Sequence, residues 1–330
     1  MTYPITRLRR LRKNATIREM IRETEVNRDD LIMPYFSCHG NKIKNPILSM
    51  PGNFQYSIDL LIKEVKDLYK KTGINKILLF GIPEKKDETG KVACSPNAIV
   101  PMTIRALKDE IPEVLIVADL CNCEYTTHGH CGTMVNGYLD NDLTIKTLVA
   151  QSITLAKAGA DFIAPSDMTD GRVGAIRKGL DENGFENTPI MAYSAKYASA
   201  FYGPFRDAAN SSPKYGDRRT HQMDPANSDE ALREIEQDIE EGADMVMVKP
   251  ALSYLDVISR AKKAFNIPLV AYNVSGEFSM VKAAAEKGWI DEERIIEEIL
   301  TSIKRAGADV IISYHAKEFV LSQIKKGKRV

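Results

Sequence analysis

The sequence predicts an α/β fold in which eight parallel strands close into a (β/α)8 barrel, preceded by an extended N-terminal arm. The first observation is a recurring step, in which a helix-like segment ends at a glycine and a short β-rich apolar run follows. The clearest of these steps occupy residues 70–80, 156–166, 240–250 and 304–314. The second observation is that these runs are continuously apolar, which is typical of strands buried on both faces in a parallel sheet. The third is length, because 330 residues suit one large α/β barrel or about two average domains.

The N-terminal segment, residues 1–28, holds few apolar residues and contains the basic run RLRRLRK. We therefore expect it to form an arm outside the core. Such a segment is either a frayed tail or an arm that wraps around a neighbouring subunit. Residues 29–330 show no break in composition of the kind that marks a linker, so we expect them to form a single barrel domain.

Eight apolar runs in the remaining chain are the expected strands. In order they are residues 29–36, 77–80, 113–120, the run within 156–166, 188–194, 245–248, 267–274 and 310–312. Their alternation with helical segments favours a closed barrel, with an open doubly wound sheet as the alternative. No glycine-rich phosphate loop follows the first strand, which argues against a dinucleotide-binding fold.

Helices are expected between these strands because apolar residues recur there at helical spacing. The clearest cases are 58–69, 232–239 and 295–303. Ser57 and Asp291 are candidate N-caps of the first and the last of these helices. The glycines that end the helices stand where a positive φ is needed, and they are Gly73, Gly159, Gly242 and Gly307.

Composition argues against several classes of function. Lys and Arg number 45, as do Asp and Glu, so the formal net charge is zero, whereas nucleic-acid and anionic-membrane binders carry a basic excess. No apolar run approaches the roughly 18 residues of a membrane span, and the N-terminus lacks an apolar signal core. We therefore expect a cytoplasmic protein without nucleic-acid or membrane partners. Five cysteines in a chain of this length do not form a disulfide framework.

The chemistry of a (β/α)8 barrel lies at the carboxyl ends of its strands. Two segments that follow strands are unusually long, at about 120–141 and 195–228. Loops of more than about 15 residues are uncommon unless they have a function, such as covering an active site. We therefore expect both segments to act as lids over the mouth of the barrel.

Two lysines end successive strands. Lys249 follows the apolar run MVMV, and Lys196 follows the strand expected at 188–194. Burial disfavours the ammonium form, and two neighbouring ammonium groups lower each other's pKa. A neutral amine can attack a ketone and form a Schiff base. The simpler alternative is that both side chains extend to solvent, but their places at successive strand ends favour the catalytic interpretation.

The segment DLCNCEYTTHGHCG, residues 119–132, brings Cys121, Cys123 and Cys131 close together in the chain. Three protein ligands with an open fourth position are typical of a catalytic zinc, and His128 or His130 would instead complete a closed tetrahedron. The spacing does not match a structural four-cysteine finger. A chance cluster of reduced cysteines is the alternative, and we favour the metal site.

Other polar residues near the strand ends suit a substrate with a carboxylate. Arg206 and Arg218 lie in the long segment after Lys196, and arginine binds carboxylates through two parallel hydrogen bonds. Pairing with nearby surface acids is the alternative for either arginine. Ser275 and Tyr314 follow the seventh and eighth strands and carry hydroxyls that donate or accept hydrogen bonds. A helix N-cap and a core aromatic are their alternatives.

The segment APSDMTDGRVGAIR, residues 164–177, follows the fourth strand. Ser166, Asp167 and Asp170 are candidates to orient a substrate amine or a lysine. Either aspartate is equally a candidate cap for the helix that begins near Arg172.

Six segments together resemble the porphobilinogen synthase family, also called the 5-aminolevulinate dehydratases. In chain order they are DLCNCEYTTHGHCG, APSDMTDGRVGAIR, YSAKYASAFYGPFRDAA, MVMVKPA, YNVSGEF and RAGADVIISY. The match covers nearly the whole chain, and the shared order makes it specific. The resemblance implies a barrel enzyme of the lyase class, which condenses two 5-aminolevulinate molecules to porphobilinogen with loss of two waters, an early step towards haem and other tetrapyrroles.

The resemblance also implies roles for individual residues. Lys249 and Lys196 match the two Schiff-base lysines, which hold the substrates that become the propionate and acetate sides, respectively. Carboxylate ligands are matched at the second substrate site by Arg206 and Arg218, and at the first site by Ser275 and Tyr314. Because Arg219 stands next to Arg218, the resemblance leaves open which of these two guanidinium groups reaches the substrate. Asp119 and Ser166 are candidates to assist proton transfer or amine binding.

The implied cofactors and assembly follow from the same resemblance. Cys121, Cys123 and Cys131 match the ligands of the zinc-using branch of the family. Glu234 lies where many members bind an activating magnesium, although an ordinary solvated helix face is the alternative in this acidic neighbourhood. The arm would pack between subunits, and the usual assembly is a homo-octamer.

Two other functions remain as alternatives. One is a class I aldolase with a single Schiff-base lysine and a structural zinc. The other is a zinc-dependent scaffold on a barrel frame, in which both long segments would bind partners and the lysines would titrate near their ordinary pKa of about 10.4.

Overall fold

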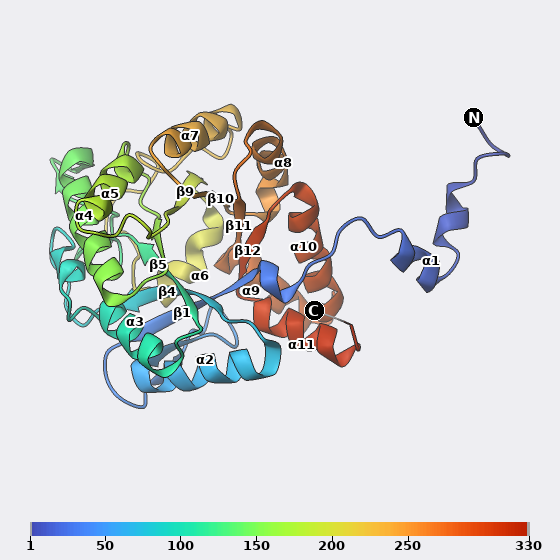
Figure 1. Cartoon of the computed structure of the whole chain (residues 1–330), viewed down its shortest axis with the longest axis horizontal. Helices are drawn as coiled ribbons and strands as arrows, with labels where there is room; N and C mark the ends of the chain where they lie inside the picture. Colours follow the sequence, from blue (N-terminus) through green and yellow to red (C-terminus); the bar gives the residue numbers. More distant parts are fainter. Residues whose placement is uncertain (1, 329–330) are drawn as a thin grey trace.

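The computed structural model describes residues 2–328, and in that part of the chain eight parallel strands form a barrel surrounded by helices (Figure 1). The barrel strands are β1 (Leu31–Cys38), β4 (Lys76–Ile82), β5 (Leu115–Leu120), β8 (Phe162–Pro165), β9 (Met191–Lys196), β10 (Met245–Lys249), β11 (Leu269–Asn273) and β12 (Val310–Ser313). They are hydrogen-bonded in the order β8-β5-β4-β1-β12-β11-β10-β9. An isolated parallel bridge between Ile163 and Ile190 connects the two ends of this order. The predicted barrel class is therefore confirmed.

Helices cover the outside of the barrel. The long ones are α2 (Ile58–Thr72), α3 (Ile99–Glu110), α4 (Asn141–Ala158), α5 (Arg172–Asp181), α7 (Asp229–Glu240), α8 (Leu255–Ala264), α9 (Ser275–Glu286), α10 (Glu292–Ala306) and α11 (Ala316–Lys325). The expected positive φ is present at Gly73, Gly159, Gly242 and Gly307. Within the described residues, no helix has both the length and the hydropathy needed to cross a membrane.

The two expected helix caps have different outcomes. Asp291 caps α10, where its carboxylate accepts a hydrogen bond from the backbone N–H of Arg294 at 3.0 Å. Ser57 precedes α2 but does not cap it with its side chain. Its hydroxyl instead donates to Asp59 at 2.6 Å and accepts from the backbone N–H of Ile43 at 2.8 Å. Ser57 is the N-cap residue of α2, as predicted, but its hydroxyl does not supply the capping hydrogen bond because these two partners occupy it.

The pleat of the strands separates two layers of core. On β10, Val246 and Val248 pack outward among the helices, whereas Met247 packs inside the barrel. Lys249 has the same parity as Met247 and therefore faces inward at the carboxyl end of the strand. On β9, Tyr193 faces inward.

A register irregularity in β9 sets the direction of its last residue. Ala192 pairs with Val246 and Ala195 pairs with Val248, so β9 has one residue more than β10 between these pairs. A bulge of this kind re-aims the side chains that follow it. Lys196 then pairs in register with Lys249, and both lysines end their strands on the same side.

Short elements surround the mouth of the barrel. They are the β2 (Lys44–Pro46) and β3 (Phe54–Ser57) hairpin, the β6 (Met134–Val135) and β7 (Tyr138–Leu139) hairpin, the 3-10 turns η3 (Lys91–Cys94), η4 (Ala200–Tyr202) and η5 (Leu252–Tyr254), and the short helix α6 (Gly203–Ala208). The loop between β2 and β3 holds α6 in place, since Ser49 donates to Asp207 at 2.8 Å. From β3 itself, Gln55 donates to the carbonyl of Ala208 at 2.7 Å.

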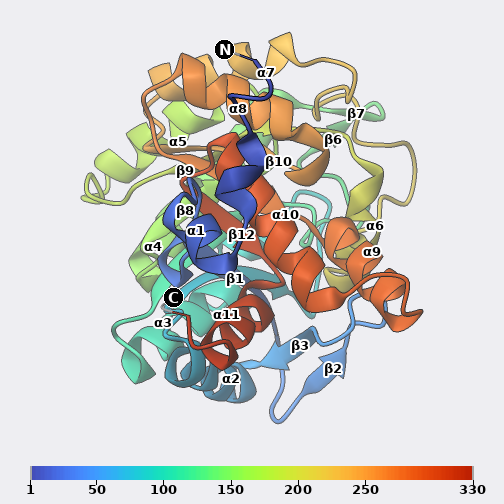
Figure 2. The same cartoon turned by 90° about the vertical axis from the view of Figure 1, so that its right-hand side faces the viewer.

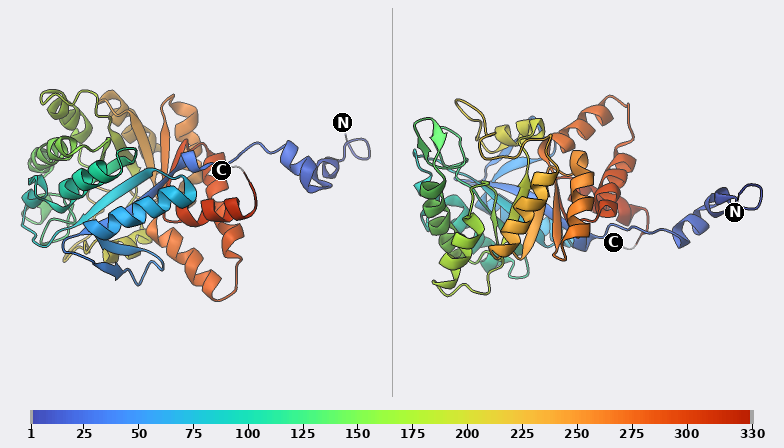
Figure 3. Two further views of the ribbon diagram at one scale, coloured as in Figure 1. Left: turned by 60° about the horizontal axis from the view of Figure 1, so that its bottom comes forward. Right: turned by 90° about the horizontal axis from the view of Figure 1, so that it is seen from above.

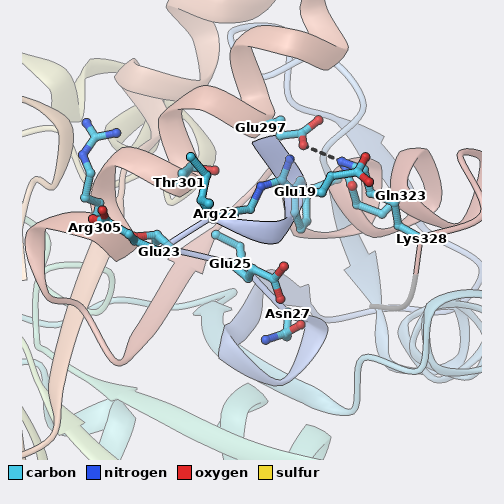
Figure 4. A pocket seen from close by; sticks show the side chains of 14 residues that line it. Glu19, Arg22, Glu23, Glu25, Asn27, Glu297, Thr301, Arg305, Gln323 and Lys328 are labelled. Atoms are coloured by element: carbon cyan, nitrogen blue, oxygen red, sulfur yellow. Dashed lines mark hydrogen bonds and ion pairs between the residues drawn. The ribbon is translucent and has the colours of Figure 1, made fainter. Parts of the chain in front are cut away.

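The N-terminal arm extends away from the barrel (Figures 1 and 3), and in Figure 2 it lies in front of the barrel because that view looks onto the side from which the arm projects. It contains η1 (Leu8–Arg12) and α1 (Ala15–Met20), neither of which has a buried residue, and η2 (Arg28–Asp30) leads into β1. Where the arm meets α10 and α11 it borders a cavity of about 730 Å³ (Figure 4). Glu19, Arg22 and Glu23 of the arm and Glu297 and Lys328 of the barrel line this cavity. The large exposed apolar side chains of the arm are Tyr3, Ile5, Leu8, Leu11, Met20 and Ile21.

Candidate active site

Lys249 lies in an aromatic environment. Both it and Lys196 are only 5% exposed. The amine nitrogen of Lys249 lies 4.3 Å from the ring centroid of Tyr272 and 5.0 Å from that of Tyr193. Burial, and then the positive charge of Lys196, lower the pKa of Lys249 to about 7. A substantial fraction of this amine is therefore neutral near neutral pH, as a nucleophile requires.

Lys196 has more polar neighbours. Its amine donates a hydrogen bond to the backbone carbonyl of Ser166, and one ring, that of Tyr193, lies 5.7 Å away. The hydroxyl of Ser166 donates to Asp119 at 3.2 Å. Burial raises the pKa of Asp119 to about 6, although the charges of Lys249 and Lys196 oppose this shift. Asp119 and Ser166 therefore lie beside the two lysines, as expected for supporting groups.

The three cysteines of the β5–β6 segment come together. The sulfur atoms of Cys121, Cys123 and Cys131 all lie within 4.8 Å of one another, and all three residues are buried. Hydrogen bonds from the other two thiols, and then the charge of Arg218, lower the pKa of Cys131 well below its usual value. A cluster containing a thiolate suits a metal that prefers sulfur ligands.

Neither nearby histidine joins this cluster. The Nε2 atom of His128 lies 3.0 Å from the carbonyl oxygen of Glu88, and that of His130 lies 2.9 Å from the carbonyl oxygen of Tyr215. Among the described residues, the group that could hold a metal consists of the three cysteines alone. The three-ligand alternative is therefore favoured over the closed tetrahedron.

The segment between β9 and α7 carries both candidate arginines over the mouth. The guanidinium of Arg218 is buried and donates to the carbonyls of Gly129 and Ser211 at 2.8 and 2.6 Å. Arg206, on α6, is half-buried, and burial followed by the charge of Arg218 lowers its pKa. Arg219 is exposed and lies 3.7 Å from Asp217. Burial therefore identifies Arg218, rather than Arg219, as the inward-facing guanidinium.

The two hydroxyl candidates are buried on neighbouring strand ends. Ser275 is the first residue of α9, which Val274 precedes as the N-cap. Its hydroxyl accepts from the backbone N–H of Phe205 at 3.0 Å and donates to the carbonyl of Phe201 at 3.3 Å. The hydroxyl of Tyr314 lies 3.1 Å from that of Tyr272. Ser275 thus connects α9 to the segment that covers the mouth, and it is not the side-chain cap considered as its alternative.

Asp167, which follows β8, has structural partners. Asp167 lies 3.8 Å from the buried guanidinium of Arg172 and accepts a hydrogen bond from the backbone N–H of Thr169 at 2.9 Å. The residue that precedes α5 is Gly171, so neither Asp167 nor Asp170 caps that helix. Arg172 also donates to Asp238 on α7 at 3.2 Å.

Glu234 lies on α7, apart from the cysteine cluster. It lines a cavity of about 390 Å³ together with Asp170, His221 and Glu230. Burial raises the pKa of Glu234, and the charge of Arg172 opposes that shift. The cavity is acidic, but the structure does not bring three metal-ligating groups together there within the described residues.

Sequence reasoning missed Gln222, a buried polar side chain that lines the same cavity as Glu234 and precedes Met223, whose backbone N–H donates to the carbonyl of Lys196 at 3.0 Å. Gln222 is 3% exposed, and neither its amide nitrogen nor its amide oxygen has a hydrogen-bond partner within residues 2–328. A buried amide without partners is costly unless a ligand satisfies it. Its place four residues after Arg218 was the available signal, but many surface glutamines have similar positions in loops.

Comparisons with known proteins agree on one family. The family model for delta-aminolevulinic acid dehydratase matches residues 5–321. This chain belongs to that family. Curated relatives of the same name include those of Synechococcus elongatus, 55% identical over 96% of this chain and 98% of the relative, and Bacillus subtilis, 54% identical with the same coverages.

A solved structure shares the fold as well. The delta-aminolevulinic acid dehydratase (porphobilinogen synthase) of Toxoplasma gondii, crystallised with the reaction product porphobilinogen, is 46% identical to this chain. The match covers 97% of this chain and 92% of that one, with a TM-score of 0.94. The predicted family, barrel fold and dehydratase activity are thereby confirmed, and the aldolase and scaffold alternatives are excluded.

Proposed function

We propose that this chain joins two 5-aminolevulinate molecules into porphobilinogen, with Lys249 and Lys196 each forming a Schiff base to one substrate. The observation that carries this assignment is the register pairing of the two buried lysines at neighbouring strand ends. Holding both substrates on adjacent strands converts a bimolecular encounter into an intramolecular reaction.

The reaction at Lys249 begins from its neutral amine. The nitrogen bonds to the ketone carbon, and the ketone oxygen leaves as water after it takes one proton from the nitrogen and one from an acid. The product is an iminium, which acidifies the adjacent carbon. Asp119, with a pKa of about 6, is populated in both protonation states near neutral pH and suits the proton transfers that follow.

The substrate carboxylates have separate ligands. On the Lys196 side we propose Arg206 and Arg218, and Gln222 adds an amide that has no other partner within the described residues. On the Lys249 side we propose the hydroxyls of Ser275 and Tyr314. The Ser275 hydroxyl also accepts a hydrogen bond from the backbone of α6. A substrate carboxylate bound there would either replace that hydrogen bond or share the hydroxyl with it.

We propose zinc as the metal of the cysteine cluster. Cys121, Cys123 and Cys131 fit it because three buried sulfurs within 4.8 Å are suitable ligands and leave a further position open. When bound, zinc supplies Lewis-acid chemistry at the mouth. Thiols used in this way must stay reduced, which supports a cytoplasmic location.

A second, weaker metal assignment concerns Glu234. Magnesium keeps several waters and needs only one or two carboxylates, which the cavity containing Glu234, Asp170 and Glu230 supplies. If magnesium activates the enzyme here, Glu234→Ala removes the stimulation and leaves the rate without magnesium unchanged. An undiminished response to magnesium in that variant would exclude the site.

The arm supports a proposal about assembly. Its apolar side chains, among them Tyr3, Leu8 and Met20, are exposed in a single chain, and covering them against another copy would remove that apolar area from water. We propose that the arm packs between subunits of a homo-octamer. Sedimentation of the full chain, compared with a chain that lacks residues 2–27, tests this assembly.

Activity is tested directly with purified protein, zinc and 5-aminolevulinate. A colorimetric assay for porphobilinogen should show product at a molar ratio of one to two substrates consumed. Absence of product from the zinc-loaded, folded protein would contradict the proposed function.

A further inference from the structure

Four aromatic rings surround the amine of Lys249. They come from four separate elements, and the distances from the nitrogen to the ring centroids are 4.3 Å for Tyr272, 5.0 Å for Tyr193, 5.3 Å for Phe205 and 5.4 Å for Tyr202. We call these four residues the aromatic box. All four distances are within the roughly 6 Å at which a cation is attracted to a ring face.

Two of the box hydroxyls are engaged elsewhere. The hydroxyl of Tyr202 donates to the backbone carbonyl of Lys249 at 3.2 Å, and that of Tyr272 pairs with Tyr314 at 3.1 Å. Phe205 has no hydroxyl. The hydroxyl of Tyr193 is buried without a hydrogen-bond partner within residues 2–328, and the amine lies over the faces of all four rings.

The box distinguishes Lys249 from its neighbour. Lys196 has one ring within range, at 5.7 Å, and donates to a backbone carbonyl. Two members of the box, Tyr202 and Phe205, also belong to the segment that covers the mouth, and Ser275 holds that segment through the backbone N–H of Phe205. The box is therefore complete only when this segment lies in the position that it has in the structure.

We propose that the aromatic box selectively stabilises the iminium on Lys249. This inference rests on the proposed function, because it concerns the Schiff base assigned to that lysine. The nucleophile must be a neutral amine, and removal of water favours the neutral form. After the ketone oxygen has left as water, the nitrogen carries a positive charge, and the ring faces attract that charge. Unlike water molecules, the rings are already fixed in position and need not reorient when the charge forms.

The rings thereby lower the energy of the charged state after bond formation. Because they occupy the space around the nitrogen, the rings also limit the access of water that would reverse the step by hydrolysis. A carboxylate in the same place would hold the free amine as an ammonium ion and slow the attack. Four uncharged rings stabilise the later cation, and they favour protonation of the free amine less than a carboxylate would.

Phe205 is the best position for a test because its substitution changes no side-chain hydrogen bond. Stepwise fluorination of its ring, from 4-fluoro to 3,5-difluoro to 3,4,5-trifluorophenylalanine, weakens the cation-binding face while nearly preserving shape. The matched control is Phe80, whose ring packs 5.0 Å from that of Phe205 but is not among the rings around the amine. The same fluorinated series at Phe80 tests effects of fluorine on packing alone.

The measurement is the equilibrium fraction of Lys249 trapped by borohydride with 5-aminolevulinate, in a Lys196→Ala background, so that the Lys249 imine is the one followed. Across the series at Phe205, the imine equilibrium constant should fall progressively, by roughly 2- to 30-fold in total for one ring. The series at Phe80 should leave it unchanged.

Two results would overturn the inference. One is a flat series at Phe205, and the other is an equal decline at Phe80. Both presuppose that unfluorinated protein forms the imine on Lys249. If it does not, the proposed function fails instead, so the two failures are distinguishable. A Phe205→Leu variant, which deletes the ring, should lower the constant at least as much as trifluorination does.

Discussion

The two lysines occupy equivalent places in the barrel but different chemical environments. Lys249 has four aromatic rings around its amine, whereas Lys196 donates to the backbone carbonyl of Ser166, whose hydroxyl donates to Asp119. The covering segment adds further charge to the mouth through Arg218, which bonds the cysteine segment at Gly129. The mouth is thus richer in aromatic rings around Lys249 and more polar around Lys196, while Asp119 lies close enough to both lysines for each of their charges to oppose the rise that burial causes in its pKa.

This difference teaches how one active site can treat two identical substrates differently. Both molecules carry a ketone, an amine and a carboxylate, so a symmetric site would bind them alike. Register pairing brings two buried amines together, and the elements beyond the strands give each its own surroundings. The asymmetry of the product follows from the asymmetry of the site.

The largest expected effect comes from removing the aromatic-side lysine. Lys249→Ala should lower porphobilinogen formation by on the order of a thousandfold or more, because the covalent intermediate on that side is lost. The matched control is Lys70→Ala, which changes an exposed lysine on α2 and should retain full activity. A Lys249→Ala enzyme that kept a tenth of the rate would remove Lys249 as a nucleophile.

Loss of the metal should affect the complete reaction but not the first Schiff base. Chelation should lower activity by at least about a hundredfold, since Lewis-acid stabilisation is worth several kcal/mol, and zinc should restore it. Cys131→Ser should behave like the chelated protein, whereas Cys94→Ser, which lies outside the cluster, should not. Full activity in rigorously metal-free protein would contradict the cysteine assignment.

The neighbouring arginines offer a matched pair on the polar side. Arg218→Leu should raise KM by about tenfold or more, because charge-assisted hydrogen bonds to a carboxylate are worth about 1.5–3 kcal/mol. The exposed Arg219→Leu should change KM by less than about twofold. Equal effects in both variants, measured by steady-state kinetics, would mean that burial does not identify the carboxylate ligand.

The smallest expected effect is a shift in pH dependence. Because burial and the charge of Lys196 lower the pKa of Lys249 to about 7, the rate of imine formation should rise with pH through that value. Lys196→Met removes the second cause, so the pKa of Lys249 rises and the increase in rate moves to higher pH. A profile that stayed in place or moved to lower pH would show that the two amines do not interact.

Much of the barrel could be predicted from the sequence because its strands are continuous apolar runs. The cysteine cluster could equally be predicted from the sequence, since its three members are close in the chain. The direction of Lys196 was not, because simple alternation from Tyr193 would turn its side chain outward, and one extra residue in β9 reverses that outcome.

The surroundings of the lysines were also beyond sequence reasoning. The four rings of the aromatic box come from β9, η4, α6 and β11, so no local pattern connects them. Gln222 is a similar case, because only the folded covering segment buries its amide. The histidines of the cysteine segment looked like ligands, yet they bond backbone carbonyls of two other loops.

The central claim is that two buried amines each hold one substrate. It is tested most directly by borohydride reduction of the zinc-loaded protein in the presence of 5-aminolevulinate, followed by mass spectrometry of its peptides. The account predicts a reduced adduct on Lys249 at low substrate and adducts on both Lys249 and Lys196 at saturation. An active enzyme that shows no adduct on either lysine, or an adduct on another residue, would contradict it.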